Sequence, residues 1–335
     1  MATTNTRYVD PNAAAGGDGT TNGLSGGTCA YVSLNVWEAA RQADLPTGDI
    51  IEKVICSSDD AGSTHLADTT AVTIDGWTTD ATRYIQIEAA SSHGGKWDAT
   101  IYRMECVDVG NCIYNKEDFV RFLGLQLYNR KSSVSWTGGG LKIDSTAAGA
   151  VILIDKCISK TGTTDNPALE FANDTRGTFN IYNCLLYDNG NGYGEIFINS
   201  WHATMNIFNC TFQNATVGIY NYNNKATVYA KNCGFSSVTT ALSGTVTETT
   251  NSTSTPTFVD AANDDFHLDD EDATWHSEGT DLSATFTDDI DGDTRSAWSI
   301  GMDDGAAAAA AFMYFGDRSG GLQNPFATGF TGGLR

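Results

Sequence analysis

The chain of 335 residues contains few basic residues and little proline. Its 19 Lys and Arg stand against 41 Asp and Glu, which gives a formal net charge of −22. Proteins that bind nucleic acid use Lys and Arg to contact phosphates, so we expect no nucleic-acid partner. Five Pro accompany 35 Gly, a balance that favours an all-β chain with many tight turns.

Several motifs that would mark an enzyme or a membrane protein are missing. No apolar run approaches the roughly 20 residues of a membrane-spanning helix, so we expect no membrane insertion. Residues 1–6 lack the basic start and the apolar stretch of a signal peptide. The five His show no metal-ligand spacing, and Gly-x-Ser-x-Gly, P-loop and Cys-x-x-Cys patterns do not occur. We therefore predict no catalytic residue from motifs alone.

The feature that the sequence does have is a repeat. Alternating apolar residues, then a corner residue, then Cys or Leu recur at Val120–Leu127, Ile152–Ser159, Phe179–Leu186, Met205–Phe212 and Val228–Phe235. The residue at the Cys place is at positions 125, 157, 184, 210 and 233, in steps of 32, 27, 26 and 23. A period of this length indicates one structural unit stacked on itself.

The corner residue interrupts the two-residue alternation that is typical of a strand with one buried face. A single inserted residue turns the chain there, and this turn needs a left-handed backbone. Gly and Asn adopt that conformation most easily, and they occur as Gly124, Asn183, Asn209 and Asn232. Lys156 is the exception, and we expect strain or a local bulge at that corner.

Second apolar runs lie between the corners, at Leu141–Ile143, Leu169–Phe171, Ile196–Ile198 and Gly218–Tyr220. Each repeat therefore holds about three short strands and cannot bury its apolar face alone. Stacking the repeats would place Cys157, Cys184, Cys210 and Cys233 inside as free thiols. The sequence leaves open whether Cys29 forms a disulfide with Cys56, or Cys106 with Cys112.

The pattern from about Phe119 to Phe235 resembles the right-handed parallel β-helix, the pectate-lyase-like superfamily, and in particular the surface β-helix proteins of phages and viruses. The resemblance implies an all-β, right-handed, single-stranded parallel β-helix with a short N-terminal capping helix and a C-terminal extension. An antiparallel β-sandwich also has many short strands, but it gives no reason for the same corner at the same offset in each repeat.

We divide the chain into four segments. Residues 1–48 hold an N-terminal segment and a capping helix, near 34–43, which Ser33 begins and which presents Val36, Trp37 and Ala40 on one face. Residues 49–257 form the coils, and residues 258–305 an acidic closing segment with 15 acids and one base, Arg295. This closing segment is similar to that of secreted and viral β-helix proteins, with a turn at 288–293 before a final strand near 299–301.

Residues 306–335 have no repeat. They begin with six Ala at 306–311, and scattered aromatic residues follow. We expect them to form a docking tail that binds other virion proteins, the alternative being a disordered terminus. The anchors of this assembly tail would be Phe312, Tyr314, Phe315, Phe326 and Phe330.

Asp289, Asp291 and Asp293 are the candidate metal ligands. They crowd together beside Gly292, and oxygen ligands in such spacing bind Ca²⁺. The alternative is a tight turn held by hydrogen bonds to the Asp side chains. The resemblance to pectate lyases also directs attention to a base near Arg121, Arg130 or Lys131, with Asp144 and Asp155, although no spacing identifies one.

Aromatic residues suggest a contact surface. We predict that Tyr182, Phe208 and Tyr229 occupy the same outward place in three repeats and stack as an exposed ridge, with Trp201, Tyr220 and Tyr222 nearby. Rings in a row bind sugar faces, but they equally support a subunit contact or cover the sheet.

The leading functional hypothesis is a phage-type virion structural protein: a tail fibre, spike or capsid-surface protrusion at the virion surface that contacts host cell-surface polysaccharide. The resemblance implies self-association, with a trimer as one form. The alternatives are a polysaccharide lyase or glycoside hydrolase of the same fold, and an exported adhesin or surface-layer protein.

Overall fold

The computed structural model describes residues 2–58, 64–107, 109–130, 139–162, 166–190 and 192–305. These residues are mostly strand and form two large sheets in which every pairing is parallel, together with one antiparallel two-stranded sheet. The chain is therefore all-β, as the sequence predicted, and its large sheets are parallel.

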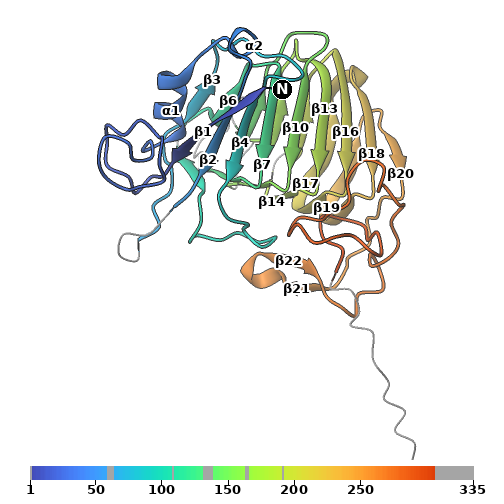
Figure 1. The fold of residues 1–335 in the computed structure, drawn as a ribbon. Coiled ribbons are helices and arrows are strands. Elements are labelled where there is room, and N and C mark those ends of the chain that lie inside the picture. Colours follow the sequence, from blue (N-terminus) through green and yellow to red (C-terminus); the bar gives the residue numbers. More distant parts are fainter. Residues whose placement is uncertain are drawn as a thin grey trace, which may run out of the picture.

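The first sheet has nine strands, which lie side by side across the molecule in Figure 1. In spatial order they are β1 (Thr3–Val9), β2 (Ile50–Cys56), β4 (Ile85–Ala89), β7 (Phe119–Leu123), β10 (Val151–Asp155), β13 (Arg176–Tyr182), β16 (His202–Phe208), β18 (Thr227–Lys231) and β20 (Thr247–Thr249). Spatial order follows sequence order throughout, so each repeat adds its strand beside the previous one.

The second sheet has eleven strands, most of which lie in two strips that we call the near strip and the far strip. The near strip contains β5 (Met104–Val107), β8 (Gln126–Arg130), β11 (Ile158–Thr161) and β14 (Leu185–Tyr187). The far strip contains β3 (Val72–Ile74), β6 (Asn111–Asn115), β9 (Gly139–Ile143), β12 (Leu169–Phe171) and β15 (Ile196–Ile198). Both strips meet at the long strand β17 (Thr211–Asn221), which also pairs with β19 (Gly234–Ser243).

The central repeats each contribute one strand to the first sheet, one to the near strip and one to the far strip, which confirms the prediction of three short strands per repeat. The register places equivalent residues together, since Phe179 pairs with Met205 and Ile181 with Ile207. Their side chains are fully buried. All eight Cys are buried and free, as predicted for the repeated Cys positions, and neither open disulfide forms.

The corners are left-handed, as the sequence predicted. The φ angles are +63° at Gly124, +51° at Asn183, +49° at Asn209 and +52° at Asn232. Lys156 adopts the same conformation, with φ +55°. Of the strain or bulge expected at Lys156, no bulge occurs, because pairing with the next repeat continues on both sides of it, through Asp155 and Ile158. The left-handed backbone of this residue is the strained alternative.

Helix α1 (Leu34–Arg41) lies at one end of the sheets (Figure 1), and α2 (Leu45–Gly48) follows it. The Ser33 side chain accepts a hydrogen bond from the Val36 backbone N–H, which confirms the predicted start. Of the residues predicted to share one face, Trp37 is buried, but Val36 is 39% exposed and Ala40 is also exposed. The buried face is instead formed by Leu34, Trp37 and Glu38, since positions three and four apart share a helix face.

The closing segment lies beside the large sheets (Figure 1) and contains the hairpin of β21 (Phe258–Asp260) and β22 (Asp265–Leu268). Two 3₁₀ turns, η1 (Tyr222–Asn224) and η2 (Ala261–Asn263), complete the elements. No strand forms at residues 299–301, which the structure describes. The Gly301 N–H instead donates to the Asn232 carbonyl oxygen, so this stretch attaches to a corner of the last repeats.

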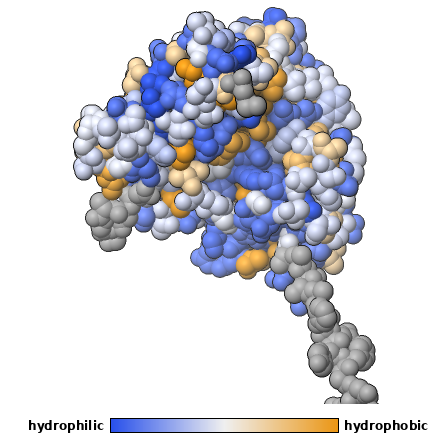
Figure 2. All heavy atoms as spheres, in the orientation of Figure 1, coloured by the Kyte–Doolittle hydropathy of each residue, from blue (hydrophilic) through white to orange (hydrophobic). Residues whose placement is uncertain are grey.

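The surface shown in Figure 2 mixes hydrophilic and hydrophobic residues, without one large hydrophobic area on that face. Within the part of the chain that the structure describes, no helix has the length and apolar character needed to cross a membrane. The predicted tail, 306–335, with its anchors Phe312, Tyr314, Phe315, Phe326 and Phe330, lies outside the described residues.

Candidate functional site

The predicted aromatic ridge is only partly formed, and its formed part is covered. Tyr182 and Phe208 stack with ring centroids 5.5 Å apart and an interplanar angle of 12°. Phe286 of the closing segment lies over Tyr182, with centroids 5.0 Å apart, and Phe208 is only 7% exposed. The two rings therefore hold the closing segment against the first sheet and do not form an exposed ridge.

Tyr229 does not continue this stack. The register pairs Tyr229 with Asn206, and it is Lys231 that lies beside Phe208. The Lys231 Nζ is 5.3 Å from the centroid of the Phe208 ring. The predicted equivalence was wrong by two residues, a shift that keeps the side chain on the same face of a strand and so leaves the apolar alternation unchanged.

Two other predicted residues, Tyr220 and Tyr222, do gather with further rings. The centroid of Phe197 lies 5.7 Å from that of Tyr220 and 5.8 Å from that of Tyr222. Tyr193 approaches Phe197 edge-on at 5.6 Å, and Tyr220 meets Tyr222 edge-on at 5.7 Å. These four residues form what we call the aromatic cluster of the far strip.

The strand register of the far strip continues the cluster into charged residues. Phe197 pairs with Glu170, Glu170 with Lys142, and Lys142 with Tyr114. Phe197, Glu170 and Lys142 each lie between two buried apolar neighbours, and Tyr114 lies between the buried residues Ile113 and Asn115. All four therefore face outward from the sheet. A cavity of about 410 Å³ opens here, lined by Lys142, Glu170, Ala172, Asn173, Tyr193, Phe197, Asn199 and Tyr222. We call it the far-strip pocket.

An ion pair lies in the wall of the far-strip pocket. Lys142 Nζ donates to Glu170 Oε1 over 2.8 Å. Glu170 is only 5% exposed, and its Oε2 atom is buried with no hydrogen-bond partner in the described part of the chain. A buried acceptor without a donor is costly to leave unpaired.

Next to the ion pair, the Tyr114 hydroxyl donates to Asp144 Oδ2 over 2.6 Å. Burial, this hydrogen bond and the nearby carboxylates raise the pKa of Tyr114 well above its ordinary value. The phenol therefore stays protonated at neutral pH and serves as a donor, not as a base.

Trp201 extends the polar side of this surface. It is 52% exposed, and its indole N–H donates to Asn173 Oδ1 over 2.8 Å. Lys225 Nζ lies 3.5 Å from the centroid of the Trp201 ring and 5.8 Å from that of Tyr222. Trp201 thus shares Lys225 with the aromatic cluster, and its exposed ring lies next to the pocket residue Asn173.

The sequence prediction missed Tyr114, Lys142, Glu170 and Phe197. A signal was present, because Lys142, Glu170 and Phe197 are the central residues of the apolar runs identified between the corners. Aligning those runs predicts that these central residues face outward and stack. The fourth run was placed one residue too early, since Ile196 pairs with Ile219 and Phe197 with Tyr220.

The closing segment holds a second cavity, of about 240 Å³, which is acidic. Asp289, Asp291 and Asp303 each offer a carboxylate oxygen, and these atoms lie within 4.8 Å of one another. Asp293 also lines the cavity, but the group of mutually close carboxylates contains Asp303 in its place. Asp289 Oδ1 accepts hydrogen bonds from the backbone N–H groups of Asp291 and Asp293, so a side-chain-stabilised turn is also present.

His267 lies at the edge of the acidic cavity. Its Nδ1 is 2.5 Å from an oxygen of Asp265, and its Nε2 is 3.1 Å from an oxygen of Asp291. Burial alone would lower the pKa of His267, but the nearby carboxylates of Asp291 and Asp265 raise it to about 9. At neutral pH an imidazolium therefore already neutralises part of the cluster, and a divalent cation would compete with it.

The residues suggested by the resemblance to pectate lyases are dispersed. Arg121 of β7 stacks on Tyr84, the residue before β4, with 3.8 Å from the guanidinium carbon to the ring centroid, and Arg130 pairs with Glu105. Asp144 bonds Tyr114, and Asp155 accepts a hydrogen bond from the corner residue Asn183. Lys131 lies outside the described residues. No base and acid among the described members of this set share a site.

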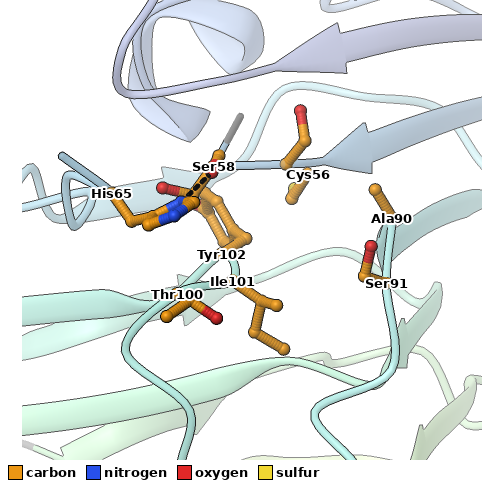
Figure 3. A pocket seen from close by; sticks show the side chains of 9 residues that line it. Cys56, Ser58, His65, Ala90, Ser91, Thr100, Ile101 and Tyr102 are labelled. Carbon is orange, nitrogen blue, oxygen red and sulfur yellow. Dashed lines mark hydrogen bonds between the residues drawn. The ribbon is translucent and has the colours of Figure 1, made fainter. Parts of the chain in front are cut away.

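A third cavity, of about 120 Å³, contains Ser58, His65 and Cys56 (Figure 3). The His65 ring bonds the backbone oxygen of Ser58, 2.7 Å from Nδ1, while the Ser58 hydroxyl donates to Leu66 O. Burial raises the pKa of the Cys56 thiol well above its ordinary value. Among the described residues of this cavity, no base contacts a nucleophile, so the arrangement does not support nucleophilic catalysis.

Comparison of the chain with protein-family models, with curated proteins and with solved structures found no match.

Proposed function

We propose that this protein binds carbohydrate through the far-strip pocket, on a right-handed parallel β-helix. The main observation in its support is that the aromatic cluster and the Lys142–Glu170 ion pair surround one cavity of about 410 Å³. The volume lies within the range of small-molecule sites. Rings supply apolar contact for the C–H face of a sugar, and charged or amide side chains supply partners for its hydroxyls.

The proposed fold class is supported by three features. The repeats each add one strand to three parallel strips, spatial order follows sequence order, and the corners recur with the same left-handed backbone. A coil of one chain that advances by one strand spacing per turn has all three features.

A polysaccharide lyase or hydrolase is the second candidate. It is favoured by two carboxylates: Glu170 lines the pocket, and Asp144 accepts a hydrogen bond from Tyr114, the strand neighbour of Lys142. Pairs of carboxylates act as acid and base in glycoside hydrolysis. Reducing-sugar release from a polysaccharide panel, abolished by Asp144→Asn, would establish this candidate in place of binding alone.

We propose that the protein binds carbohydrate at the surface of a virion. It would be part of a tail fibre, a spike or a capsid protrusion, and it would assemble by self-association. The support is the resemblance of the repeat and of the closing segment to phage surface proteins. Capsid or terminase genes beside the coding sequence are the expected observation, and a sugar-uptake operon there would favour an adhesin or an enzyme.

The binding proposal is tested by affinity electrophoresis of the full chain in gels containing different polysaccharides. We expect retardation by at least one of them and a loss of roughly tenfold in affinity for Tyr222→Ala, because a lost ring contact costs about 1–1.5 kcal/mol. Tyr229→Ala is the matched control, since Tyr229 is a half-buried ring on the other sheet. Equal losses for the two variants, or no retardation by any polysaccharide, would contradict the proposal.

A further inference from the structure

The charge arrangement around Glu170 indicates which class of sugar the far-strip pocket takes. This inference rests on the proposed carbohydrate binding. The Glu170 carboxylate is nine-tenths buried, with Oε1 paired to Lys142 and Oε2 left without a partner among the described residues. A carboxylate oxygen only accepts hydrogen bonds, so the ligand group that meets Oε2 has to be a donor.

The ionic state of the pocket selects among donors. Lys142 and Glu170 neutralise each other at 2.8 Å, and Lys142 is only 15% exposed. A ligand carboxylate would meet the acceptor Oε2 in a poorly hydrated place, where like charges repel strongly. A ligand ammonium would meet the charge of Lys142 in the same way. A neutral hydroxyl meets neither penalty.

The remaining neighbours also suit a neutral, polyhydroxylated ring. Asn173 and Asn199 line the pocket, and amide groups both donate to and accept from hydroxyls. The charged groups next to the pocket have other partners, since Lys225 lies over the Trp201 ring and Asp144 accepts from Tyr114. No unpaired cation among the described lining residues is placed to hold an acidic sugar.

We infer that the far-strip pocket binds a neutral hexose unit, one hydroxyl of which donates to Glu170 Oε2 while the ring lies against the aromatic cluster. The charge-assisted hydrogen bond supplies the selectivity for a neutral donor. The aromatic rings supply apolar contact with the face of the sugar ring.

The test is titration calorimetry of the full chain with three oligosaccharide sets: neutral hexoses, uronic acids and deacetylated amino sugars. We expect binding of the neutral set, and at least tenfold weaker binding of the other two. Glu170→Gln should weaken neutral binding about tenfold and improve uronate binding, since it leaves Lys142 as an unpaired cation. A purely structural role for Glu170 would weaken all sets equally.

Glu88→Gln is the matched control, because Glu88 is also ion-paired to a lysine, Lys53, at 2.6 Å but lies on the first sheet. It should leave all three affinities unchanged. Tighter binding of uronic acids or amino sugars by the unaltered chain would overturn the neutral-hexose inference while leaving carbohydrate binding intact. Absence of binding in every set would overturn both.

Discussion

Arg295 and Asn183 are joined across 112 residues of chain by a hydrogen bond of 2.9 Å, from Nη2 of the guanidinium to the side-chain oxygen of the corner residue. The same Nη2 donates to the backbone oxygens of Gly301 and Met302. Arg295, the only Lys or Arg of the acidic closing segment, therefore fixes that segment to the repeat.

The first prediction follows from this contact. Arg295→Ala should lower the free energy of unfolding by about 3 kcal/mol, because it leaves buried acceptors without a donor. The change is measured by urea unfolding followed by tryptophan fluorescence. Arg176→Ala serves as the control, since Arg176 is exposed on β13. If the two variants unfold at the same urea concentration, Arg295 does not hold the closing segment.

The second prediction separates two roles of the corner Asn. The Asn209 amide donates to the backbone oxygens of Ser299 and Gly301, and its side-chain oxygen accepts from Asn232. Asn209→Gly keeps the left-handed backbone and should cost about 2 kcal/mol through the lost hydrogen bonds. Asn209→Ala should cost about 1 kcal/mol more through backbone strain.

Gly124 is the internal comparison for the corner experiment, because it occupies an equivalent corner with φ +63° and has no side chain. Gly124→Ala should show the strain component alone. Equal stability of Asn209→Gly and the unaltered chain would show that the side-chain contacts with the closing segment contribute nothing.

The third prediction concerns pH. Burial raises the pKa of Glu117 to about 7, while its carboxylate accepts from the Trp77 backbone N–H beside helix α1. An acid whose pKa is raised by folding destabilises the fold when it ionises, so stability falls as pH rises from about 4.5 to 7. Glu117→Gln should be more stable by about 1–2 kcal/mol at pH 8 and unchanged at pH 4.

The Glu117 effect is measured as the difference in melting temperature between pH 4 and pH 8, with Glu248→Gln as the control because Glu248 is exposed. A Glu117→Gln variant that retains the full pH difference of the unaltered chain would contradict the assignment.

The fourth prediction tests the acidic cavity. If Ca²⁺ binds there, it should raise the melting temperature by a few degrees, because a ligand of the native state stabilises it. Asp303→Asn should remove this shift, whereas Asp293→Asn should preserve it, since Asp303 and not Asp293 lies with Asp289 and Asp291. Calorimetric titration with CaCl₂ provides the direct measurement. Loss of the shift with Asp293→Asn alone would restore the ligand set predicted from sequence.

Part of the site was within reach of sequence reasoning. The apolar runs that contain Lys142, Glu170 and Phe197 were found, and their middle residues face outward as two-residue periodicity requires. The stack of Tyr182 on Phe208 was also predicted and is confirmed. The contact of Phe286 with Tyr182 was not predicted, because it joins segments about a hundred residues apart that share no periodicity.

The sequence by itself determined the repeat, the strands with their buried faces, and the left-handed corners. These are local properties, set by the alternation of side chains along a strand and by the steric freedom of Gly and Asn. Only the tertiary structure decided where the closing segment lies, and hence that Asn183, Asn209 and Asn232 bind it and that Asp303 joins Asp289. Such contacts depend on the three-dimensional approach of distant segments, which no pattern along the chain encodes.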